Sequence, residues 1–99
     1  MKNGYAESIL QQGDGCWLCG NTAGKLDRHE VFGGAYRSKS KADGLWILLC
    51  HDSCHLNGVH KYADLARNIR IHAQTVAQFR YGWSTADFIK RYGKNYLEE

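Results

Sequence analysis

Apolar side chains recur every three or four positions through residues 62–77. This spacing is typical of one face of an α-helix. Gly82 then marks the expected end of the helix, and Ser84 with Asp87 predicts the capped start of a second one. The second helix is expected to end before Gly93. The apolar stripe of the longer helix comprises Tyr62, Leu65, Ala66, Ile69, Ala73, Val76 and Ala77.

The first two thirds of the chain contain two shorter apolar segments that predict β-strands. Residues 25–32 mix apolar and polar side chains before two consecutive glycines, and residues 45–49 are a run of large side chains. The basic segment 36–44 between them predicts a loop, and residues 5–12 predict a short helix. Another helix is expected to begin near Cys54. We therefore expect a small α+β fold whose additional C-terminal helices cover a small sheet.

Size and charge limit the class of protein. We expect 99 residues to form a single domain over residues 1–99, with a core at about 14–62 and a helical extension at about 63–96. A net charge of +3 favours nucleic acid slightly as a partner. The longest apolar run, residues 45–50, is too short to span a membrane. Nothing at the N-terminus resembles a secretion signal, so we expect a cytoplasmic protein with reduced thiols and no membrane partner.

Four cysteines lie in two close pairs, Cys16-x2-Cys19 and Cys50-x3-Cys54. A tetrahedral metal ion needs soft ligands held about 3.5–4 Å apart, and a short turn between two cysteines supplies two of them. Two such turns about thirty residues apart fit the zinc-ribbon and treble-clef patterns. The spacing therefore predicts one structural Zn²⁺ bound by all four thiolates. The alternative is a pair of disulfides in a secreted protein.

A second group of candidate ligands combines imidazole and carboxylate groups. Asp27 and His29 share one face of the first predicted strand, and His55 and His60 follow the last cysteine. Such groups can hold a catalytic cation, and a histidine beside it could take a proton from water. A regular helix would turn His60 about 140° away from His55. The helix must therefore be distorted or end near Gly58.

Several of these residues also have plainer interpretations. His51 is either a bystander or a rival ligand within the second cysteine pair, and His72 is expected on the surface of the long helix. The basic run of Arg37, Lys39 and Lys41 is usually a solvated loop. Beside a phosphodiester site, the same run would be well placed to hold backbone phosphates.

Taken together, the motifs resemble the HNH endonucleases with a ββα-metal core, above all the small versions encoded by bacterial viruses and prophages. The resemblance rests on Cys-x2-Cys, Asp-Arg-His-Glu-Val-Phe-Gly-Gly, Arg37-x2-Ser40, Leu-Leu-Cys-x3-Cys-His and Gly-Val-His, in that order. It covers residues 16–60, and residues 87–96 resemble the tails of the same proteins. It implies a zinc-stapled treble-clef or ββα-metal core.

The resemblance also implies an activity, which is metal-dependent hydrolysis of phosphodiester bonds in DNA. His29 is then the general base, and a cation such as Mg²⁺, Mn²⁺ or Ni²⁺ is held by His55 and His60 together with Asp27. The four cysteines hold a separate structural zinc. The gene would belong to a phage or prophage in a bacterial cell. The residues expected to contact DNA are Arg28, Arg37, Lys39 and Lys41.

The chain departs from the pattern of this family in two places. Arg28 occupies the position before the base, where the family has a metal ligand. Either Asp27 substitutes for that ligand, or His29 is the ligand and Glu30 is the base. The asparagine of the family name is missing from the start of the second strand, residues 43–45. These departures leave an alternative function: a weak or inactive zinc-stapled module that binds nucleic acid or protein.

Overall fold

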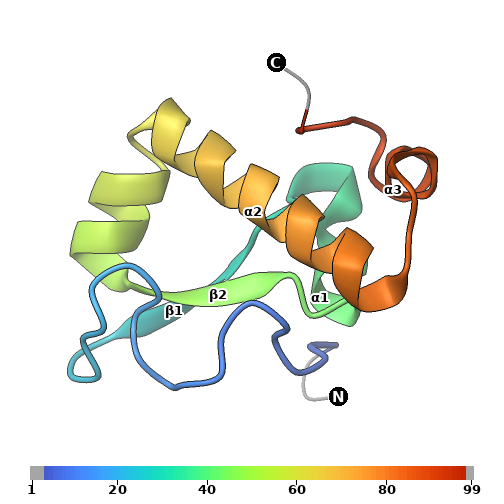
Figure 1. Ribbon diagram of the computed structural model, residues 1–99. Coiled ribbons are helices and arrows are strands. Elements are labelled where there is room, and N and C mark those ends of the chain that lie inside the picture. Colours follow the sequence, from blue (N-terminus) through green and yellow to red (C-terminus); the bar gives the residue numbers. More distant parts are fainter. Residues whose placement is uncertain (1–3, 98–99) are drawn as a thin grey trace.

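A two-stranded antiparallel sheet lies at the centre of the computed structural model, which describes residues 4–97, and helices pack around the sheet (Figure 1). The protein is thus a small α+β fold. None of the helices in the described residues combines the length and the apolar character needed to cross a membrane. The elements are β1 (Leu26–Glu30), the 3₁₀-helix η1 (Gly34–Tyr36), α1 (Arg37–Ala42), β2 (Trp46–Cys50), the π-helix η2 (His51–Val59), α2 (Ala63–Tyr81) and α3 (Thr85–Tyr92).

The register of the sheet determines which side chains face the helices. Asp27 lies opposite Leu49, and His29 lies opposite Ile47. Directly opposed residues of an antiparallel pair share one face of the sheet. Leu49 and Ile47 are fully buried, so Asp27 and His29 lie on the inner face. Arg28, between them, lies on the outer face.

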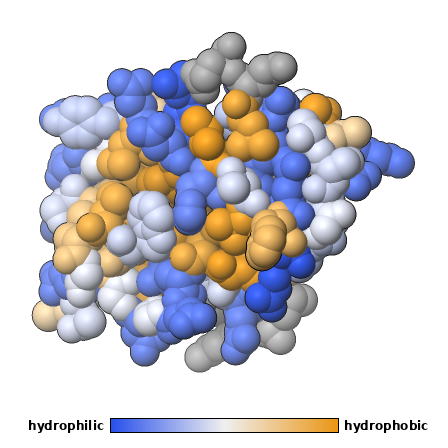
Figure 2. Space-filling view, in the orientation of Figure 1, coloured by the Kyte–Doolittle hydropathy of each residue, from blue (hydrophilic) through white to orange (hydrophobic). Residues whose placement is uncertain are grey.

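The two C-terminal helices form as their apolar spacing predicts. Ile69, Ala73 and Ala77 of α2 are buried, and α2 ends at Gly82 with a positive φ of 69°. The α3 helix starts with a capping box between Ser84 and Asp87. Its Phe88 and Tyr92 complete the core with Phe32 and Leu45. Other apolar side chains remain visible in patches among polar ones on the face shown in Figure 2, as is usual for a protein surface.

The helix expected at residues 5–12 is absent, and this prediction was wrong. The segment instead runs along the free edge of β2 (Figure 1). Ser8 Oγ donates to the carbonyl of Trp46 at 2.7 Å, and the N–H of Leu48 donates to Gln11 Oε1 at 2.7 Å. The N–H of Trp17 donates to the carbonyl of Leu48 at 2.7 Å. Polar groups of the segment thus satisfy edge groups that a local helix would have left unpaired.

The loop expected at residues 36–44 is also wrong, because this segment contains α1. The helix has no apolar stripe, and its one buried residue is Ser40. Ser40 Oγ donates to the carbonyl of Leu45 at 2.6 Å and accepts the N–H of Phe32 at 3.2 Å. A buried hydroxyl that joins α1 to the strands replaces the apolar face by which such helices are usually recognised.

Asp43, which follows α1, fastens α3 to the rest of the fold. Its carboxylate accepts hydrogen bonds from Arg91 Nε and Nη2 at 2.5 and 2.7 Å and from Tyr92 Oη at 2.6 Å. Its backbone carbonyl accepts from Tyr81 Oη at 2.7 Å. The carboxylate is mostly buried, so its removal would leave both partners without an acceptor.

We expect the change Asp43→Ala to lower the free energy of unfolding by about 1–3 kcal/mol, because Arg91 and Tyr92 lose their shared acceptor. Urea denaturation of the metal-loaded protein measures this. Asp14→Ala removes an exposed carboxylate and should change the same quantity by less than about 0.5 kcal/mol. Equal effects of the two changes would contradict the role assigned to Asp43.

Candidate functional site

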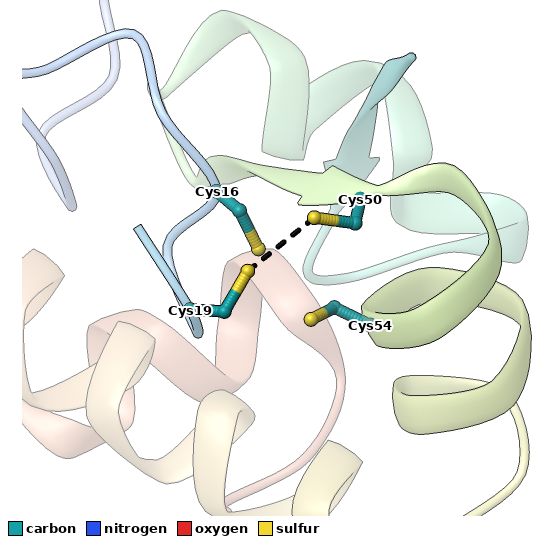
Figure 3. Close-up of side chains that lie close together, drawn as sticks. All are labelled: Cys16, Cys19, Cys50 and Cys54. Carbon is teal, nitrogen blue, oxygen red and sulfur yellow. Dashed lines mark hydrogen bonds between the residues drawn. The ribbon is translucent and has the colours of Figure 1, made fainter. Parts of the chain in front are cut away.

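The two cysteine pairs meet at one end of the sheet (Figure 3). Cys16 and Cys19 lie in the segment before β1, Cys50 ends β2, and Cys54 lies in η2. All four sulfur atoms lie within 4.8 Å of one another. The Sγ atoms of Cys19 and Cys50 are 3.4 Å apart, well beyond the length of a disulfide, about 2.05 Å. The cysteines are free thiols, and this group could bind a metal ion.

The electrostatics of the thiols favour a cation among them. Burial raises the pKa of Cys16, but N–H groups of Cys19, Cys50 and Leu18 outweigh it and lower that pKa to about 6. Burial raises the pKa of Cys54 to about 12. Four neighbouring thiolates are therefore not stable by themselves. A cation would compensate their charge, and thiolate ligands suit zinc.

Three histidines form a second group of candidate ligands. His29 comes from β1, His55 from η2, and His60 follows the end of η2. One ring nitrogen of each lies within 4.8 Å of the others, and the Nε2 atoms of His55 and His60 are 2.9 Å apart. Two nitrogens that bind one ion at right angles, each at about 2.0–2.1 Å, are separated by about the same distance. The group can therefore hold a second cation.

The π-winding of η2 is what brings His55 and His60 together. Their five-residue spacing would separate them on an α-helix by about 140°. In a π-helix, hydrogen bonds join residues five apart, and the N–H of His60 donates to the carbonyl of His55 at 3.0 Å. Five residues therefore complete about one turn, and both rings lie on one side. The sequence predicts a helix that is distorted or ends near Gly58, and the π-helix η2 is that distortion.

Asp27 lies outside the three-histidine group, although the sequence predicts it as a direct ligand. Its Oδ2 accepts hydrogen bonds from Nδ1 of His51 at 2.6 Å and from Nδ1 of His55 at 2.8 Å. The bond from His55, helped by the one from His51, lowers the pKa of Asp27 below its usual range. The carboxylate is therefore on the side of the His55 ring away from Nε2. His51, treated as a bystander or rival ligand, is its second partner.

His29 is held neutral by its surroundings. Burial, with smaller contributions from His55, His60 and Arg70, lowers its pKa to about 4. An imidazole that is neutral at pH 7 has a lone pair available to take a proton or to bind a metal.

The alternative base, Glu30, is engaged elsewhere. Its carboxylate accepts Tyr5 Oη and Arg37 Nε, each at 2.5 Å. Its side chain is only 9% exposed. Of the two candidates, His29 is the one with a free acceptor that faces the other histidines.

A cleft of about 560 Å³ opens over the three histidines. Arginines from three different elements line it: Arg28 of β1, Arg37 of α1 and Arg70 of α2. Two cations expected at the site lie elsewhere. Lys39 Nζ donates to the carbonyl of Arg91 at 3.2 Å, and Lys41 Nζ lies 4.6 Å from the ring centre of Tyr5. The cleft therefore gathers positive charge around the histidines.

Sequence reasoning missed Arg70. It lies on α2 one turn after Ala66, and both residues line the cleft. The available signal was its place in the first half of α2, the helix that begins shortly after His60. A larger hollow of about 690 Å³ lies between the N-terminal segment and the far end of α2, and its lining contains none of these histidines.

We predict that the chain binds one zinc ion at its four cysteines and unfolds when the ion is removed, because structural zinc contributes on the order of 10 kcal/mol to folding. Elemental analysis and circular dichroism before and after chelation measure this. Cys54→Ser should lose the ion, and the neighbouring exchange Ser53→Ala should keep it. Well under one zinc per chain, with the thiols oxidised in pairs, would contradict the prediction.

No family model, no curated protein and no solved structure matches this chain. What the protein does is therefore inferred from the geometry of its two groups of ligands.

Proposed function

We propose that the protein is a metal-dependent DNA endonuclease of the HNH type that hydrolyses phosphodiester bonds. One observation carries the proposal: a half-buried, neutral His29 faces His55 and His60 beneath a cleft lined by three arginines. A base, a pair of metal ligands and several phosphate-binding cations are the parts that this hydrolysis needs.

The fold supports the same proposal. Two antiparallel strands lead directly into η2, and the cysteine group lies where β2 meets that helix. This order fits a treble-clef or ββα-metal core stapled by zinc. Asp43, at the start of the second predicted strand where the family has its asparagine, is occupied with Arg91 and Tyr92. The chain thus uses that position to hold α3.

His55 and His60 would hold the catalytic cation. When bound, the ion supplies positive charge that polarises the scissile phosphate and stabilises the leaving oxygen. Imidazole nitrogens suit Ni²⁺ better than Mg²⁺, so nickel is the best fit among the ions that the resemblance implies. The Nε2 atom of His55 is free for this role because Nδ1 is engaged with Asp27.

His29 would act as the general base. Its low pKa leaves the ring unprotonated at neutral pH, and it takes a proton from the water molecule that attacks phosphorus. Glu30 supports the site by a different route, since its carboxylate orients the guanidinium of Arg37.

Arg37 and Arg70 would bind the phosphates on either side of the histidines. Arginine offers several N–H donors in a planar fork that matches phosphate oxygens. Arg28 can extend this contact along the DNA, because its exposed guanidinium stacks 4.7 Å from the ring centre of Tyr5. Such contacts bind the backbone without selecting a sequence.

We expect His29→Ala to reduce nicking of plasmid DNA by about 10²- to 10⁴-fold, because the general base is lost. The assay uses zinc-loaded protein with Ni²⁺, Mn²⁺ or Mg²⁺ added in turn. His72→Ala changes an exposed histidine of α2 and should leave the rate unchanged. Nicking by the His29 variant at the wild-type rate would place the base elsewhere, with Glu30→Gln as the next test. DNA binding without cleavage by the wild type would favour the binding module.

We also expect Arg70→Ala to weaken binding of duplex DNA similarly for all sequences and to lower the slope of log K against log salt by about 1. Fluorescence anisotropy in the His29→Ala background measures binding without cleavage. Arg80→Ala removes the same charge at the far end of α2 and should have a smaller effect. Equal losses would mean that total charge, and not the cleft, determines affinity.

A further inference from the structure

A single carboxylate oxygen holds two imidazole rings on the inner face of the sheet. Asp27 Oδ2 is 2.6 Å from His51 Nδ1 and 2.8 Å from His55 Nδ1. An ionised carboxylate has no proton to donate. Both Nδ1 atoms must therefore carry the hydrogen, so one residue determines the tautomer of two histidines.

The consequence for His55 is direct. A neutral imidazole with its proton on Nδ1 has its lone pair on Nε2, and Nε2 of His55 is the atom 2.9 Å from Nε2 of His60. The opposite tautomer would put a hydrogen between the two nitrogens and remove one metal ligand. The hydrogen bond also fixes the direction of the ring, since only 16% of the His55 side chain is exposed.

His51 further fixes the position of the Asp27 carboxylate through a second hydrogen bond, from its Nδ1 to the same oxygen. Each of the two imidazoles directly follows a cysteine of the four-thiol group, His51 after Cys50 and His55 after Cys54. Asp27 therefore ties β1 to η2 directly after each cysteine of the second pair, Cys50 at the end of β2 and Cys54 within η2. The position of His55 is thus set from two sides, by Cys54 along the chain and by Asp27 across the sheet.

We propose that Asp27 is a positioning residue that fixes the tautomer and direction of His55 for metal binding and does not itself bind the ion. This assigns it a role different from the ligand role that the sequence predicts. The proposal rests on the proposed function in one respect, that His55 and His60 bind a cation. Carboxylate partners of this kind typically change metal affinity by about 10–100-fold when removed.

The test uses full-length, zinc-loaded protein with Asp27→Ala, the isosteric change Asp27→Asn, and Asp14→Asn as a control at an exposed carboxylate. The ¹⁵N chemical shifts of the His55 ring identify which nitrogen carries the proton. Titration with Ni²⁺ gives the affinity of the histidine group. We expect Asp27→Ala to lose the Nδ1–H preference and to bind Ni²⁺ about 10–100-fold more weakly. Asp27→Asn should lose less Ni²⁺ affinity, because its amide oxygen can still accept the hydrogen bond from His55 Nδ1. Asp14→Asn should match the wild type in both measurements.

Wild-type Ni²⁺ affinity in folded Asp27→Ala would overturn the proposal. Weaker binding with His55 still protonated on Nδ1 in that variant would also overturn it, because Asp27 would then act on structure alone. If Asp27→Ala does not fold, Asp27→Asn decides. Weaker Ni²⁺ binding with the Nδ1–H preference of His55 unchanged would then overturn positioning, and weaker binding that accompanies loss of that preference would support it.

The outcome is separable from that of the nuclease proposal. If the ¹⁵N shifts of His55 and the Ni²⁺ affinities are as expected but the wild type does not cleave DNA, the nuclease proposal is wrong and the role of Asp27 stands. If the wild type cleaves DNA but the Asp27 changes leave Ni²⁺ binding and the His55 tautomer unaffected, the nuclease proposal stands and the role of Asp27 is wrong. A wild-type protein that binds none of Ni²⁺, Mn²⁺ and Mg²⁺ at its histidines overturns both.

Discussion

The register between β1 and β2 is the constraint on which the site depends. It places Asp27 opposite Leu49 and His29 opposite Ile47. The carboxylate of Asp27 and the imidazole of His29 therefore share the inner face of the sheet. Side chains alternate between faces with a period of two, and a slip by one residue would move both groups to the outer face. The fully buried Leu49 and Ile47 make that slip costly. Packing of β2 thus specifies the position of residues on β1.

Much of the fold follows from patterns within the sequence. The periodic stripe, Gly82 and the capping pair gave α2 and α3 close to their observed bounds, because these signals are local. Segment 5–12 and α1 were missed for the opposite reason. Their conformations depend on hydrogen bonds to distant partners, the free edge of β2 in one case and Ser40 with Leu45 and Phe32 in the other.

The site was predictable to a similar extent. The cysteine spacing correctly indicated one group of four thiols, because two short turns leave little freedom in where their sulfurs lie. The position of Asp27 behind His55 required knowledge of which ring nitrogen faces the strand. Arg70 required the angle at which α2 crosses the sheet. Spacing along a chain does not encode either quantity, since both arise from packing between elements.

The N-terminal segment has a further consequence for the free edge of β2. An unpaired strand edge is a template for pairing with another chain, and a two-stranded sheet has little else to shield it. Here Ser8, Gln11 and Trp17 occupy the edge of β2, and all three precede β2 in the sequence. During synthesis, the segment that covers this edge therefore leaves the ribosome before the edge exists.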